Sequence, residues 1–148
     1  MASVGTVRIY RPPPASADDV HCCGRATFSV RRLSPTRLAV TAVGDIDATN
    51  GRALGHFVER HTGISRQLVL DLRAVGFFGG QGFTALYYIA VHCTRSDVDW
   101  TLVGGAAVRR LLRICDTKGE LPLADDLPSA LARLDRLAQC RHHVAGSG

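Results

Sequence analysis

The sequence predicts a single α/β domain with a mixed, mostly parallel sheet against which helices pack. Three observations predict this class. Short apolar segments of strand character alternate with longer segments of helical periodicity, which is typical of a sheet covered by helices. The chain has 148 residues, enough for one ordinary domain. Hydrophobic residues make up 46% and charged residues 21%, so the chain can bury a sizeable core.

The strands are predicted from apolar runs. Residues 28–33 alternate between apolar and polar, and residues 38–43 form a second run after the turn residues 34–35. Residues 67–72 are apolar almost throughout, as in a central strand that is covered on both faces.

The first helix should follow Gly44–Asp47. Asp47 or Thr49 is expected to cap it, because a short side-chain oxygen accepts from the free N–H groups of the first turn. Gly63 is the expected C-terminal stop.

The second half of the chain continues the alternation. A glycine-rich turn over residues 76–82 is followed by a helix over residues 83–93, whose residues are apolar almost all round and are therefore expected to be buried. The remaining predicted elements are a strand at 100–103, a helix at 108–115, a short edge strand at 121–123 and a last helix that begins at Leu127.

Composition shifts at both ends predict the domain boundaries. Residues 1–25 include three consecutive prolines and are expected to be a flexible arm, residues 26–140 the domain, and residues 141–148 a polar tail. The alternating Val4–Tyr10 segment could pair across a homodimer.

Several function classes are not indicated by the composition. The chain has no apolar run of membrane-spanning length and no apolar secretory segment near its start, so a cytoplasmic protein without membrane association is expected. The net charge is +5, but the basic residues are scattered, so nucleic acid is not expected as a partner. The five cysteines have no CxxC spacing, and neither a disulfide framework, a metal site nor a cofactor is expected.

The glycine-rich turn is the one candidate for ligand chemistry. Backbone N–H groups at a helix N-terminus can hold a phosphate, so a small-molecule, nucleotide or anion sensor at Gly79–Gly82 stays an alternative. The turn lacks the Lys-Ser/Thr pair of a P-loop, and its glycines do not fit GxGxxG spacing.

No enzyme is predicted. Asp71, His92 and Cys93 are residue types that occur in catalytic triads, but Cys93 lies late in an apolar helix and no sequence feature activates it.

The segments taken together resemble the STAS domain, the family of bacterial anti-sigma factor antagonists and sulfate-transporter tails. Residues 44–47 are similar to its G-x-L-D step from strand to helix, and residues 68–78 to its central strand, V-D-L-S-x-V-x-F. Gly82 matches the glycine that closes the family's D-S-x-G loop. Further similar segments are Ala85–Leu86, Thr101–Gly104, Val108–Leu112 and Asp126–Leu131, so the resemblance covers about Phe28 to Leu137.

The resemblance implies a regulatory protein–protein interaction module in transcription. In this family the loop and the helix after it dock against an anti-sigma factor, often an ATP-dependent kinase, and free the sigma factor. Phosphorylation of a loop serine switches docking off, because phosphate adds about −1.5 to −2 charges to that surface. The implied partner is an anti-sigma factor or another protein of a STAS pathway.

The chain departs from the family at this switch. The family's aspartate falls at Gly79 and its serine at Gly80, which has no hydroxyl group to phosphorylate. Thr84 is the nearest hydroxyl, but we do not expect it to substitute from within the first helical turn. The protein is therefore expected to be a constitutively competent antagonist or a divergent member of a STAS assembly. The predicted partner-binding residues are Asp45, Asp47, Phe78, Gly79, Gly80, Gln81, Gly82 and Phe83.

The phenylalanines beside the loop are a candidate apolar patch. Phe77 is expected to be buried under the helix, and burial and exposure are equally open for Phe78 and Phe83.

Overall fold

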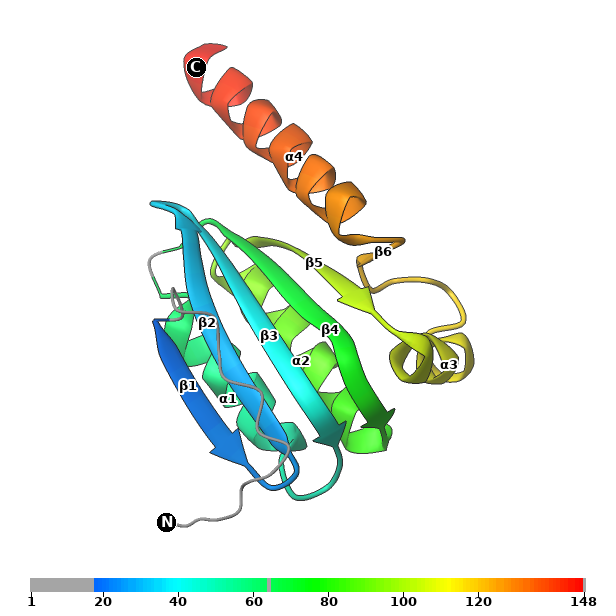
Figure 1. The fold of residues 1–148 in the computed structure, drawn as a ribbon. Helices are drawn as coiled ribbons and strands as arrows, with labels where there is room; N and C mark the ends of the chain where they lie inside the picture. Colours follow the sequence, from blue (N-terminus) through cyan, green and yellow to red (C-terminus); the bar gives the residue numbers. More distant parts are fainter. Residues whose placement is uncertain (1–17, 64, 148) are drawn as a thin grey trace.

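In residues 18–63 and 65–147, which the computed structural model describes, six strands lie in one sheet in their order along the chain (Figure 1). The strands are β1 (Asp19–Cys23), β2 (Ala26–Ser34), β3 (Arg37–Ile46), β4 (Gln67–Phe78), β5 (Asp99–Gly104) and β6 (Leu123–Ala124), and the helices are α1 (Gly51–His61), α2 (Gly80–Arg95), α3 (Ala106–Cys115) and α4 (Leu127–Ser147).

The sheet is mixed. β1, β2 and β3 pair antiparallel, whereas β3 with β4, β4 with β5 and β5 with β6 pair parallel. Each parallel pair is joined through a helix, as a parallel crossover requires. The predicted class, a single α/β domain with a mostly parallel sheet, is confirmed.

The main core lies between the sheet and three helices. Leu68, Leu70 and Leu72 point to one face of β4, because side chains alternate along a strand. They share the main core with the apolar stripes of α1, α2 and α3. Figure 1 shows α1 and α2 side by side behind the sheet.

α4 packs on the opposite face of β4 and β5. Val69 and Leu134 are buried but lie outside the main core. Gln67, which points to the same side as Val69, donates from Nε2 to the Leu134 carbonyl oxygen at 2.7 Å. The central strand is therefore covered on both faces, as its continuous apolar sequence predicts.

Both predicted boundary segments contain regular structure. Asp19–Cys23, placed in the flexible arm by the sequence, form β1 because they pair antiparallel with Ala26–Val30. Residues 141–147, expected to be a tail, continue α4. Val4–Tyr10 lies outside the described residues.

The predicted cap of α1 is wrong. The N-cap residue is Asn50, and it makes no side-chain capping hydrogen bond. The Asp47 carboxylate instead accepts from the backbone N–H and hydroxyl groups of Thr49, because the turn before the helix places both donors next to it.

Candidate functional site

The passage from β4 into α2 is tighter than the predicted glycine-rich turn. β4 continues to Phe78, Gly79 alone joins it to the helix, and α2 begins at Gly80. The Gly79 N–H donates to the Ile46 carbonyl oxygen at 3.1 Å, and the Gly79 carbonyl oxygen accepts from the N–H of Gly82 at 2.9 Å. This junction is thus held both to the end of β3 and to the first turn of α2.

The two adjacent phenylalanines have opposite environments. Phe77 is 53% exposed, whereas Phe78 is 5% exposed. The expectation that Phe77 is buried is wrong, because β4 runs on to Phe78 and turns Phe77 away from the core. Phe78 cannot be a surface contact for the same reason, and Phe83 is partly buried against the core.

The glycines of the junction differ in what surrounds them. A Cβ on Gly82 would lie 2.6 Å from the Phe78 ring, and one on Gly79 would lie 3.1 Å from the Phe77 ring. A Cβ on Gly80 would meet no atom within 4 Å. Gly80 therefore presents open backbone to solvent, whereas its neighbour Gly79 lies against the exposed ring of Phe77.

The predicted acidic residues lie at the same end of the sheet. Asp45 is the Cα partner of Phe77 in the β3–β4 register. The carboxylate of Asp47 is held by Thr49, whose hydroxyl and backbone hydrogen bonds keep the pKa of Asp47 below its usual range. The structure thus brings Asp45, Asp47 and the junction together at the carboxyl ends of β3 and β4.

The buried amide of Asn50 organises this end of the sheet. Its Nδ2 donates to the carbonyl oxygens of Cys23 (3.1 Å) and Asp45 (2.8 Å), and its Oδ1 accepts from the Asp47 N–H at 2.9 Å. Asn50 is 1% exposed. Asn50 was not among the residues predicted from the sequence, although an amide side chain directly before a helix is a signal that could have pointed to it.

The start of α1 contacts the start of α2 through glycine. A Cβ on Gly51 would lie 2.8 Å from the Gln81 carbonyl oxygen, so only glycine permits this approach. Gln81 is exposed, and the Thr84 hydroxyl donates to the Gly80 carbonyl oxygen at 3.2 Å.

The residues considered for catalysis do not form a triad. The buried Cys93 thiol has its pKa raised to about 12 by burial, so it is protonated near neutral pH. The nearest polar contact of His92 is the Thr62 hydroxyl at 2.6 Å. Asp71 pairs with Arg73 instead.

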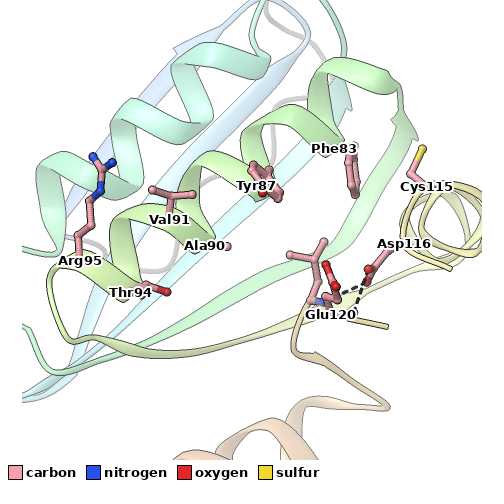
Figure 2. Close-up of a pocket in the computed structure, with 10 residues that line it drawn as sticks. Phe83, Tyr87, Ala90, Val91, Thr94, Arg95, Cys115, Asp116 and Glu120 are labelled. Atoms are coloured by element: carbon pink, nitrogen blue, oxygen red, sulfur yellow. Dashed lines mark hydrogen bonds between the residues drawn. The ribbon is translucent and has the colours of Figure 1, made fainter. Parts of the chain in front are cut away.

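Two grooves flank α2, and neither was predicted. One, of about 370 Å³, lies between α1 and α2 and is lined by Arg52, His56, Gln81, Thr84 and Tyr88, among others. The other, also about 370 Å³, lies between residues 83–95 of α2 and residues 115–121 (Figure 2). We call the second one the α2–α3 groove.

The expectation that residues 83–93 are buried all round is wrong. Tyr87 is 59%, Tyr88 40% and Val91 37% exposed. These side chains lie on the flanks of α2 that face the two grooves, because no other element covers them. A helix whose sequence is apolar on nearly all sides can still expose one side to solvent where no other element packs against it.

Two features are absent from the described part of the chain. None of its helices is long and apolar enough to cross a membrane. No group of three or more His, Cys, Asp or Glu side chains within residues 18–63 and 65–147 is arranged to hold a metal ion.

Comparison with known proteins identifies the domain. A family model described as the STAS domain matches residues 29–130. Osmosensory protein A of Mycobacterium tuberculosis (strain ATCC 25618 / H37Rv) is 34% identical over 97 residues, which are 62% of this chain and 61% of that protein. The match therefore spans less than two thirds of the relative's length.

Two solved structures have a similar fold. The crystal structure of an anti-sigma factor antagonist from Mycobacterium paratuberculosis superposes with a TM-score of 0.56 at 25% identity, covering 73% of this chain and 92% of that one. The anti-sigma factor antagonist SpoIIAA in its unphosphorylated form superposes with a TM-score of 0.59, covering 76% and 96%. Its identity is 10%, so this likeness concerns the fold alone.

Proposed function

The chain belongs to the STAS domain family, and we propose that within it the protein is an anti-sigma factor antagonist that acts by binding and not by catalysis. One observation carries the proposal. At the carboxyl ends of β3 and β4, the exposed ring of Phe77 lies against Gly79, and the backbone of the next residue, Gly80, is open to solvent. The similar antagonist structure at 25% identity supports the choice of partner class.

The proposed docking surface consists of Asp45, Asp47, Phe77, Gly79, Gly80 and Gln81, and we call it the loop surface. Phe77 replaces Phe78 of the sequence-based set, since an anchor must be exposed before binding. Gly82, which is buried, and Phe83, which is partly buried against the core, are left out of the set for the same reason. An aromatic side chain that enters a partner's pocket supplies a large share of binding energy. The open Gly80 backbone lets that partner approach closely.

Docking is proposed to be independent of phosphorylation at this loop. Gly80 carries no hydroxyl group, and the hydroxyl of Thr84 is already directed to the Gly80 carbonyl oxygen within the helix. The partner class includes anti-sigma factors of the kinase type. Such a kinase would bind this chain but could not phosphorylate it at Gly80.

The test is affinity capture from a lysate of the native host, with the wild type, Gly80→Arg and Gly63→Arg as baits. Gly63 is the matched control, because it is exposed, lies before the amino end of β4, and a Cβ there meets no atom within 4 Å. We expect the wild type and Gly63→Arg to retain an anti-sigma factor, and Gly80→Arg to lose it.

Equal recovery of that factor by all three baits would move the interface away from the loop surface. Absence of any sigma-pathway protein from the wild-type eluate would contradict the proposed function itself.

The groove between α1 and α2 favours a second candidate, an anion or nucleotide sensor. Arg52 and His56 line it together with Gln81, which belongs to the Gly79–Gly82 segment. If this candidate is correct, inorganic phosphate or ATP raises the melting temperature of the wild type, because a ligand that binds only the folded state stabilises it. The rise should vanish in Arg52→Ala. An unchanged wild-type melting temperature would reject the sensor.

A further inference from the structure

We propose that the α2–α3 groove holds one amphipathic helix of the protein partner, with the N-terminus of that helix at Asp116 and Glu120 and its C-terminus at Arg95. This inference rests on the proposed function. The family resemblance already implies a partner contact at α2; the inference adds the groove beside α2, the secondary structure of the bound segment and its direction.

The wall of the groove that α2 forms is apolar, and two of its side chains, Tyr87 and Val91, are exposed. Phe83, Tyr87 and Val91 are spaced by four residues and therefore lie along one side of α2. Tyr87 is the most exposed aromatic side chain in the part of the chain that the structure describes, and Val91 lies one turn beyond it. Leu121 lines the opposite wall. Such a row exceeds the scattered single apolar residues of an ordinary surface.

The shape of the groove suits a helix. One wall is a straight stretch of α2 from Phe83 to Arg95, which spans about 18 Å at 1.5 Å per residue. A partner helix of about three turns has the same length, and its residues at i, i+3, i+4 and i+7 form a matching apolar stripe.

The charges of the groove set the direction of that helix. Figure 2 shows Asp116 and Glu120 near Phe83 at one end, and Arg95 at the other end of α2. The Asp116 carboxylate accepts from the N–H groups of Glu120 (2.9 Å) and Leu121 (3.0 Å), which positions this acidic end. A helix carries partial positive charge at its N-terminus and partial negative charge at its C-terminus. The proposed direction places each end of the partner helix against the opposite charge.

The test begins with a displayed library of helical peptides of about 16 residues, selected against the full chain. Selection is followed by binding measurements on Tyr87→Ser and Tyr88→Ser. The two tyrosines are adjacent and both exposed, but Tyr88 lines the other groove. We expect the selected peptides to carry an i, i+3, i+4, i+7 apolar stripe. Tyr87→Ser should weaken their binding about tenfold or more, and Tyr88→Ser by less than about twofold. An equal loss in both variants, or none in either, would overturn the inference.

Cys115 provides a readout of direction. Its thiol is exposed and lies at the Asp116 end of the groove. A selected peptide with a chloroacetyl group at its N-terminus should alkylate Cys115 faster than the same peptide with that group at its C-terminus. The reverse order, or equal rates, would overturn the proposed direction. Cys140, exposed on α4, measures the background rate.

Failure of this inference is separable from failure of the proposed function. If the captured anti-sigma factor binds Tyr87→Ser as tightly as the wild type but does not bind Gly80→Arg, the loop surface stands and the groove is excluded as a partner site.

Discussion

Gly82 lies so close to the ring of Phe78 that a Cβ at position 82 would come within 2.6 Å of it. This contact allows the first turn of α2 to pack directly on the last residue of β4. It holds Phe78 in the core, and the same strand geometry leaves Phe77 in solvent. The exposure of Phe77 on the loop surface thus depends on Gly82, a glycine inside α2.

Gly82→Ala should lower the free energy of unfolding by about 1–3 kcal/mol, because the added methyl group overlaps a buried ring. Urea unfolding followed by circular dichroism measures the change. Gly80→Ala is the matched control in the same turn of α2, where a Cβ meets nothing, and it should leave stability unchanged or slightly raised. Equal destabilisation by both variants would show that loss of glycine itself, and not the Phe78 contact, matters.

Asn50→Ala should destabilise the fold by about 2 kcal/mol or more. The substitution leaves the partly buried carbonyl oxygens of Cys23 and Asp45 and the Asp47 N–H without their Asn50 partner. Thr49→Ala removes an exposed neighbour and should cost much less. Amide hydrogen exchange provides a second measurement: protection should fall first at the β1–β2 turn and the start of α1, and uniform loss of protection would contradict the local role.

The ion pairs between α4 and the start of β5 should make stability depend on pH in acid. Arg141 contacts Asp97 at 2.9 Å and Asp99 at 2.7 Å. Hydrogen bonding from Arg141, and then its positive charge, lower the pKa of Asp97. Because the pKa of Asp97 is lower in the folded state, its ionised carboxylate stabilises the fold at pH values above the unfolded-state pKa of about 3.9. This stabilisation is lost as the pH falls through the folded-state pKa.

Asp97→Asn tests this dependence. Asn tolerates the left-handed backbone at this position (φ 57°), so the change removes mainly the charge. The wild type should be more stable than the variant at about pH 6, and the two should converge as the pH falls through the lowered folded-state pKa of Asp97. The difference should be small because the Asp97 carboxylate is exposed. A difference that persists at the lowest pH would assign it to the backbone rather than to the ion pair.

Cys93 should be unreactive in the folded protein. Its buried thiol has a pKa of about 12, whereas Cys22, Cys115 and Cys140 are exposed. Iodoacetamide labelling at about pH 8, read by peptide mass spectrometry, should modify the exposed cysteines and spare Cys93 until denaturant is added. Labelling of Cys93 at the rate of Cys115 would contradict its burial.

The sequence by itself determined the order of strands and helices from β2 to α4 and the class of the fold. It could do so because apolar residues recur about every two residues in a half-buried strand and about every 3.6 residues in a helix. The central position of β4 followed from the continuous apolar run at residues 67–72, which needs cover on both faces. The place of the loop surface stays a prediction: the resemblance to the STAS family pointed to residues 44–47 and 79–82, and the structure brings these two segments to the same end of the sheet.

Only the tertiary structure decided which side chains reach that surface. Phe77 and Phe78 are chemically identical neighbours, and their exposure depends on how far β4 continues before α2 begins. Asn50 acquires its role because the β1–β2 turn, distant in sequence, brings a carbonyl oxygen to it. The exposure of Tyr87 depends on which elements leave α2 uncovered. Periodicity describes one element at a time, whereas burial is decided by the elements that pack against it.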